Sequence, residues 1–92
     1  MSEIEILNSS SNAVVAKLND REYPGMLLQG DTLRIFLDDI DELGEELEAG
    51  DLDSAQEISN GLKKRFVELL AHYEHVLEQQ GLSLPYTGSV RD

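Results

Sequence analysis

Nine carboxylates fall between Asp38 and Asp53, and no Lys, Arg or His interrupts them. Carboxylates at this density suit three kinds of chemistry: general acid–base catalysis, binding of a hard metal ion, or attraction of a cationic partner. Acid–base catalysis needs a carboxyl whose pKa is shifted by burial or by a close charged neighbour. The acids in this run are expected on an exposed surface, so the sequence predicts no catalytic residue there.

Two histidines offer a second kind of chemistry. His72 and His75, with Glu68, have the i, i+4, i+7 spacing that places side chains on one side of a helix and can form one edge of a metal site. Both histidines lie off the apolar stripe of their predicted helix, so we expect them in solvent. The sequence shows no second set of ligands elsewhere.

A calcium loop is the remaining metal candidate. Asp39 and Asp41, followed by Gly44, resemble the start of such a loop, but its twelfth position would be Gly50 instead of the required Glu. The chain also contains no Cys, which excludes thiolate ligands and disulfides. The sequence therefore predicts no metal site and no cofactor.

The carboxylates are positioned by a helix predicted over residues 31–49. Gly30 lets the chain turn out of the preceding segment, Asp31 or Thr32 can cap the first turn, and Gly50 is a natural stop. Six apolar residues form a stripe with helical spacing, which we expect to face the core: Leu33, Phe36, Leu37, Ile40, Leu43 and Leu47.

The rest of this helix surface is almost wholly anionic. Like charges at i,i+3 or i,i+4 destabilise a helix by roughly 0.2–0.5 kcal/mol per pair, so seven such pairs amount to roughly 1.5–3.5 kcal/mol before salt screening. That is a large share of the roughly 5–15 kcal/mol that stabilises a small domain, which favours a functional surface over one that serves solubility alone. We predict that seven carboxylates contact a partner: Asp38, Asp39, Asp41, Glu42, Glu45, Glu46 and Glu48.

Residues 3–29 predict a β meander of two or three antiparallel strands. Ile4 and Ile6 alternate with polar residues, residues 13–18 are mostly apolar with two β-branched valines in the middle, and a third extended segment follows at residues 22–29. Pro24 lacks a backbone N–H, so the third strand is expected at a sheet edge or at a bulge. Polar residues 8–12 form the first turn.

A second helix is predicted over residues 51–80. Asp51 or Asp53 can cap its start, and Gln80-Gly81 can end it. Asn60-Gly61 lies inside this helix and can kink or break it. The short link between the two helices makes them an antiparallel hairpin.

The tail, residues 81–92, begins with apolar residues that can pack back on the body, whereas residues 87–92 look frayed. With 92 residues, the chain is predicted to form a single domain. The predicted fold is α+β: a small antiparallel sheet of two or three strands followed by an antiparallel helical hairpin.

The charge balance restricts the partners. Nineteen acids against seven bases give a net charge of −12, which repels nucleic acids and anionic membranes and attracts basic partners. No apolar run approaches the roughly 18 residues of a membrane span, and the first residues are acidic where a secretory signal is basic. We therefore expect a cytoplasmic protein that binds neither nucleic acid nor membrane.

Two motifs, Arg21-Glu22-Tyr23-Pro24-Gly25 and Gln29-Gly30-Asp31-Thr32-Leu33, resemble those of a family of small, largely uncharacterised bacterial proteins. The resemblance continues at Asn12-Ala13-Val14-Val15, His72-Tyr73-Glu74 and Leu84-Pro85-Tyr86, and it covers most of the chain. It implies a bacterial, cytoplasmic protein and no known enzyme activity. The motif residues suit structural roles at a strand edge, a turn, a helix cap and a packed tail.

These observations favour an acidic protein-binding inhibitor over an enzyme. The most concrete form is an immunity protein that neutralises a basic bacterial toxin, such as a nuclease. One alternative is a phage-type nucleic-acid mimic that inhibits a nucleic-acid-binding protein, and another is a small ligand-binding domain or enzyme with a pocket between sheet and hairpin. The strand edge near Pro24 also leaves room for a homodimer.

Overall fold

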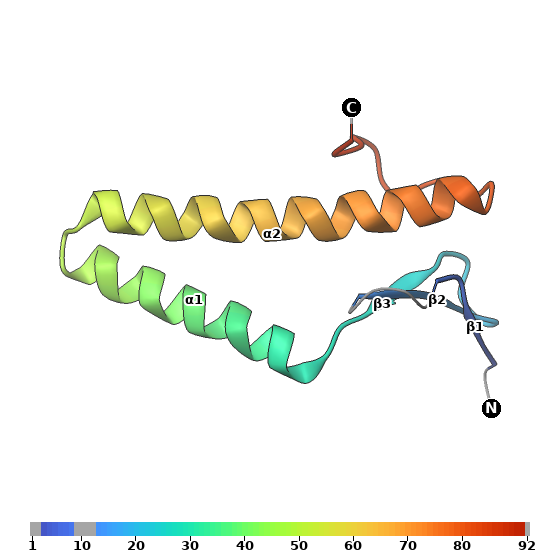
Figure 1. The fold of residues 1–92 in the computed structure, drawn as a ribbon, viewed down its shortest axis with the longest axis horizontal. Helices are drawn as coiled ribbons and strands as arrows, with labels where there is room; N and C mark the ends of the chain where they lie inside the picture. Colours follow the sequence, from blue (N-terminus) through green and yellow to red (C-terminus); the bar gives the residue numbers. More distant parts are fainter. Residues whose placement is uncertain (1–2, 9–12, 92) are drawn as a thin grey trace. The chain divides into compact units, whose positions relative to one another are not determined.

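The described part of the chain forms a three-stranded sheet followed by two helices (Figure 1). The computed structural model describes residues 3–8 and 13–91. Its elements are β1 (Ile4–Ile6), β2 (Val14–Leu18), β3 (Gly25–Leu27), α1 (Gly30–Glu48) and α2 (Leu52–Gln79). The predicted α+β fold is confirmed. Of the predicted turn at residues 8–12, residues 9–12 lie outside the described part.

The sheet is an antiparallel meander in the order β1-β2-β3. Ile4 pairs with Leu18 across the first two strands, and Val15 pairs with Met26 across the second two. Pro24 directly precedes β3, an edge strand, so its missing N–H removes no ladder hydrogen bond between strands. The edge position expected for this segment is confirmed.

The chain divides into two compact units. The sheet unit comprises the described residues of 1–29 and 69–92, and the hairpin unit comprises Gly30–Glu68. Helix α2 contributes its first part to the hairpin unit and its last part to the sheet unit.

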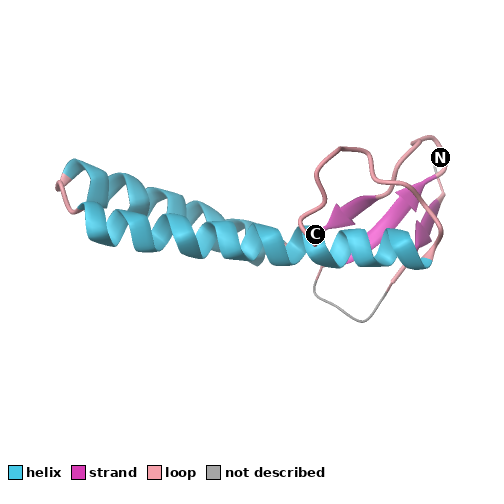
Figure 2. Cartoon of the chain, turned by 90° about the horizontal axis from the view of Figure 1, so that it is seen from above, coloured by secondary structure: helices cyan, strands magenta, loops and turns pink. Residues whose placement is uncertain are grey.

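The core of the sheet unit forms between β2 and the C-terminal turns of α2. The strands lie beside these turns in both views (Figures 1 and 2). Val15 and Leu77 are fully buried, and Tyr73 and Val76 complete the cluster. Because side chains alternate along a strand, Val15 points to the face opposite that of Val14 and Ala16. One face of the sheet is thus packed.

The hairpin unit is held by caps at its turn. Gly50 has a φ of 76°, which its missing side chain permits without strain. Its N–H bonds the Leu47 carbonyl at 3.1 Å, and the Asp51 N–H bonds the Glu46 carbonyl at 3.0 Å, which is the Schellman arrangement. Asp51, not Asp53, then caps α2 by accepting the Ser54 N–H at 3.0 Å.

Helix α2 continues through Asn60-Gly61 without a break. Beside that pair, the Gln56 side-chain amide donates to the Asn60 side-chain oxygen at 2.9 Å. The helix ends as predicted: Gly81 has a φ of 69°, and the Leu82 N–H bonds the Leu77 carbonyl at 2.9 Å. The sequence left open whether this pair kinks or breaks the helix. The structure has one continuous helix here, because a single glycine costs only about 1 kcal/mol in a helix interior.

The expectation that residues 87–92 are frayed is wrong for residues 89–91. The Ser89 hydroxyl and the Val90 N–H both donate to the Glu74 carboxylate, at 2.5 and 3.1 Å. Arg91 forms an ion pair with Glu78 at 2.7 Å. Carboxylates on α2 therefore fix the tail, an arrangement that the polar composition of the tail does not indicate.

Candidate partner-binding surface

All seven carboxylates predicted to bind a partner lie on α1. Four of them, Asp41, Glu42, Glu45 and Glu48, are exposed and form no ion pair with any residue that the structure describes. Glu46 is half-buried near the end of the helix. The four exposed carboxylates are thus free to meet a cation from outside the chain.

Asp38 and Asp39 differ from the other five because each has an arginine partner. Asp38 forms an ion pair with Arg34, one helical turn earlier, at 3.0 Å. Asp39 accepts from Arg65 of α2 at 2.9 Å, and its side chain is only 29% exposed. Sequence reasoning missed both pairs, although the i,i+4 spacing of Arg34 and Asp38 was available to indicate the first.

The apolar stripe of α1 is largely exposed, which contradicts the expectation that it faces a core. Phe36 is buried, but Leu33 and Leu47 are each 54% exposed and Ile40 is 50% exposed. The physical reason is geometric. An apolar stripe more than about 100° wide needs neighbours on more than one side, and the hairpin unit supplies α1 with a single neighbouring helix.

The packing inside the hairpin unit is correspondingly small. Phe36 and Phe66 stack with ring centroids 4.9 Å apart and planes inclined by 28°. Ala55 is buried as well, at 4% exposed. Across residues 30–68, all of which the structure describes, these are the positions where apolar burial concentrates.

Exposed leucines and unpaired carboxylates therefore occur on the same helix. A large exposed apolar patch with a polar rim is typical of a protein–protein contact. The like-charge spacings 41/45, 42/45 and 45/48 stay uncompensated, and the last turn of α1 contains no basic residue to match the helix dipole. A cationic partner would relieve both unfavourable terms.

Among the acids that the structure describes, the buried one lies elsewhere, in the sheet unit. Glu74 is 3% exposed and accepts hydrogen bonds from the Tyr86 hydroxyl at 2.8 Å and from Ser89 and Val90 of the tail. The Ser89 hydroxyl contributes most to lowering the pKa of Glu74 below its ordinary value. Because its hydrogen-bond partners Tyr86, Ser89 and Val90 all lie in the tail, this carboxylate tethers the tail to α2.

The aromatic hydroxyls of the sheet unit have matching structural roles. The Tyr73 hydroxyl donates to the buried Pro24 carbonyl at 2.6 Å. Burial raises the pKa of Tyr86 to about 12, assisted by its hydrogen bond to the Glu74 carboxylate. Pro24, Tyr73, Glu74 and Tyr86 belong to three of the sequence motifs described above, and their contacts account for those motifs by packing and hydrogen bonding.

The histidines do not form a metal centre with Glu68. His75 is exposed, as expected, but His72 is half-buried, and its Nε2 has no hydrogen-bond partner among the described residues. Residues 3–8 and 13–91 contain no group of three or more His, Asp or Glu arranged to hold a metal ion.

No helix in the described part of the chain is long and apolar enough to cross a membrane. No curated protein and no solved structure matches the sequence. A family model described as a family of unknown function, DUF6959, matches residues 1–86. That match covers nearly the whole chain, and the protein therefore belongs to this family.

Proposed function

We propose that the chain is a protein-binding module that uses α1 to engage a basic partner. In its most specific form it is a bacterial, cytoplasmic immunity protein that neutralises a basic toxin such as a nuclease. The observation that carries the proposal is the presence, on one helix, of exposed leucines together with four carboxylates that have no ion-pair partner in residues 3–8 and 13–91.

The two kinds of side chain would contribute differently. Burial of Leu33, Ile40 and Leu47 against a partner stabilises the complex by about 25 cal/mol per Å² of apolar area. The carboxylates accelerate encounter with a basic surface and make association sensitive to salt. A partner would therefore offset both the exposed apolar area of α1 and the repulsion between its carboxylates.

A nuclease is the favoured target because it must hold phosphates in a cationic groove, which carboxylates on a helix can occupy. A nucleic-acid mimic would use the same acids. Exposed leucines have no counterpart in a phosphate backbone, however, so they favour a contact shaped for one protein over general mimicry of nucleic acid.

Capture from the native host at low salt tests the proposal, with the bound protein identified by mass. The test variant is Glu42→Lys with Glu45→Lys. The matched control is Glu5→Lys with Glu22→Lys, which makes the same change in net charge at exposed positions of the sheet unit. We expect the test variant to bind the captured basic protein on the order of 100-fold more weakly, because like charges then face each other.

The control variant should keep its affinity within a few-fold. A Leu33→Ser variant should weaken binding while leaving the salt dependence unchanged, because it removes apolar contact and no charge. Equal affinities for the test variant and the control, or capture of a partner without a basic surface, would refute the proposal.

A further inference from the structure

The outer face of the sheet carries an apolar surface that the proposed function does not use. The register places Ile4 opposite Leu18 and Ile6 opposite Ala16, so these side chains share the face opposite Val15. Ile4 is 61% exposed and Leu27, on β3, is 66% exposed. One face of the sheet is packed and the other is open.

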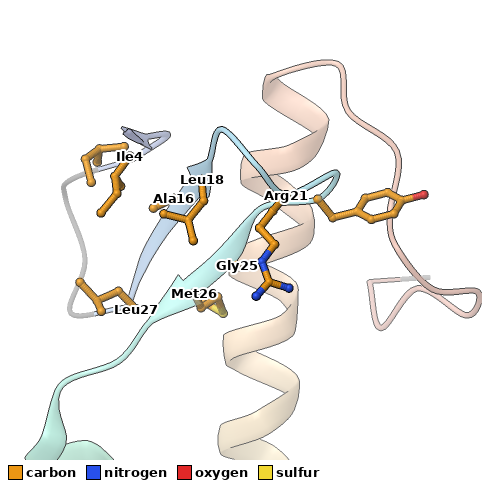
Figure 3. A pocket seen from close by; sticks show the side chains of 9 residues that line it. Ile4, Ala16, Leu18, Arg21, Gly25, Met26 and Leu27 are labelled. Atoms are coloured by element: carbon orange, nitrogen blue, oxygen red, sulfur yellow. The ribbon is translucent and has the colours of Figure 1, made fainter. Parts of the chain in front are cut away.

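The middle of this outer face is hollow because its residues are small. Ala16 pairs directly with Gly25, and larger side chains surround the two. The hollow has a volume of about 490 Å³, within the roughly 300–1,000 Å³ typical of small-molecule sites. In Figure 3, Ile4 and Leu27 lie on one side of it, and the Arg21 side chain extends along the other.

Arg21 is the charged group that lines the hollow. Arg34, Arg65 and Arg91 each form an ion pair with a carboxylate, whereas Arg21 has no such partner among the described residues. Because the chain contains 19 acidic residues, an arginine that forms no ion pair with a described carboxylate is unusual here. Its guanidinium keeps a planar set of donors that matches a carboxylate.

We propose that this hollow binds a medium-chain monocarboxylic acid. The acyl chain lies over Ala16 and Gly25, in contact with Ile4 and Leu27, and the carboxylate accepts hydrogen bonds from Arg21. Local charge complementarity selects this ligand class, because the hollow pairs an apolar floor with Arg21, which has no carboxylate partner among the described residues. The net charge of −12 opposes docking of a second copy of the chain.

Sodium decanoate is the probe, titrated below its micelle concentration and followed by the backbone amide NMR signals. We expect saturable shifts confined to the three strands and the turn around Arg21. Decan-1-ol, which has the same chain and no charge, is the matched ligand control. Arg21→Gln should weaken decanoate binding about tenfold or more while leaving decan-1-ol binding unchanged.

Gly25→Val tests the hollow itself. A Cβ at this position meets nothing within 4 Å, and valine is favoured in strands, so the fold should be retained. Its side chain fills the floor, and we expect loss of both ligands. Gly44→Ala on α1, where a Cβ also meets nothing within 4 Å, should bind decanoate normally.

Three results would overturn this inference. The first is a set of amide shifts that never saturate. The second is an Arg21→Gln variant whose affinity for decan-1-ol falls as much as its affinity for decanoate. The third is a dimer, seen by sedimentation, that Gly25→Val dissociates, because the face would then be a contact between copies. The Glu42→Lys, Glu45→Lys variant should bind decanoate within about twofold of the unmodified chain. A failure of decanoate binding can thus be distinguished from a failure of the proposed protein contact on α1.

Discussion

The two units of the chain use apolar residues in opposite ways. In the sheet unit, Val15 and Leu77 are fully buried, with Tyr73 and Val76 packed around them. In the hairpin unit, most of the leucines on α1 remain in contact with water, and burial concentrates at Phe36 and Ala55.

The difference shows which surfaces serve stability and which remain for binding. The sheet unit is held by a packed core and by a tail fixed to Glu74. The hairpin unit depends on local features: the caps around Gly50 and Asp51, two ion pairs and one aromatic stack. A helix stabilised by its ends leaves its long sides free for a partner.

The largest expected effect separates buried from exposed leucine. Leu77→Ala should destabilise the chain by roughly 2–5 kcal/mol, because it leaves a cavity in the core. Leu47→Ala, at a 54% exposed position of α1, should change stability by about 0.5 kcal/mol or less. Urea denaturation followed by circular dichroism measures both, and equal losses would remove the contrast between the units.

A pH titration of stability tests the tail attachment. The pKa of Glu74 is lowered in the folded chain, so its stabilisation is present above the ordinary value of 4.5 and is lost as the pH falls through the lowered pKa. The pKa of Tyr86 is raised to about 12, so its stabilisation is present below pH 10 and is lost as the pH rises from 10 towards 12.

The comparison with Glu74→Gln isolates this contribution from the other acids. The difference in unfolding free energy between the unmodified chain and the variant should shrink at acidic pH, where Glu74 is protonated. If the difference in unfolding free energy is equal at every pH, Glu74 does not stabilise the tail through its charge.

Tyr73→Phe addresses one buried hydrogen bond of the sheet unit. Loss of the hydroxyl leaves the Pro24 carbonyl without its donor, and we expect a loss of roughly 1–2 kcal/mol in the free energy of unfolding. Tyr23→Phe is the matched control, because Tyr23 is 40% exposed and should change stability little. Thermal unfolding compares the two variants, and similar midpoints would argue against this contact.

The smallest effect has the opposite sign and lies in the hairpin unit. Glu45→Gln removes like-charge contacts with Asp41, Glu42 and Glu48, and should stabilise the chain by roughly 0.5–1.5 kcal/mol at low salt. Because salt screens exposed charges, the gain should nearly vanish at 1 M salt. A gain that persists at high salt would point to a cause other than repulsion.

The sequence predicted the fold because its local signals agree with one another. Gly50 and Gly81 end the helices where expected, and Pro24 marks the edge strand. Alternation along β1 and helical spacing along α2 each have one simple interpretation. Such signals act over a few residues, so they can be read without knowledge of distant contacts.

Contacts between residues far apart in the sequence could not be predicted from the sequence. Arg65 lies 26 positions from Asp39, and Tyr86 and Ser89 reach back to Glu74 from the tail. Periodicity correctly marked the apolar face of α1, but it carries no information on whether anything covers that face. The hollow of the sheet likewise depends on Ala16 and Gly25 being paired in register, which composition does not reveal.

Amide hydrogen exchange of the chain, free and with its captured basic partner, tests the central claim most directly. We predict that binding slows exchange along residues 30–48, which comprise α1, and leaves the amides of β1, β2 and β3 unchanged. Protection confined to the strands, with α1 exchanging as fast in the complex as in the free chain, would contradict the account.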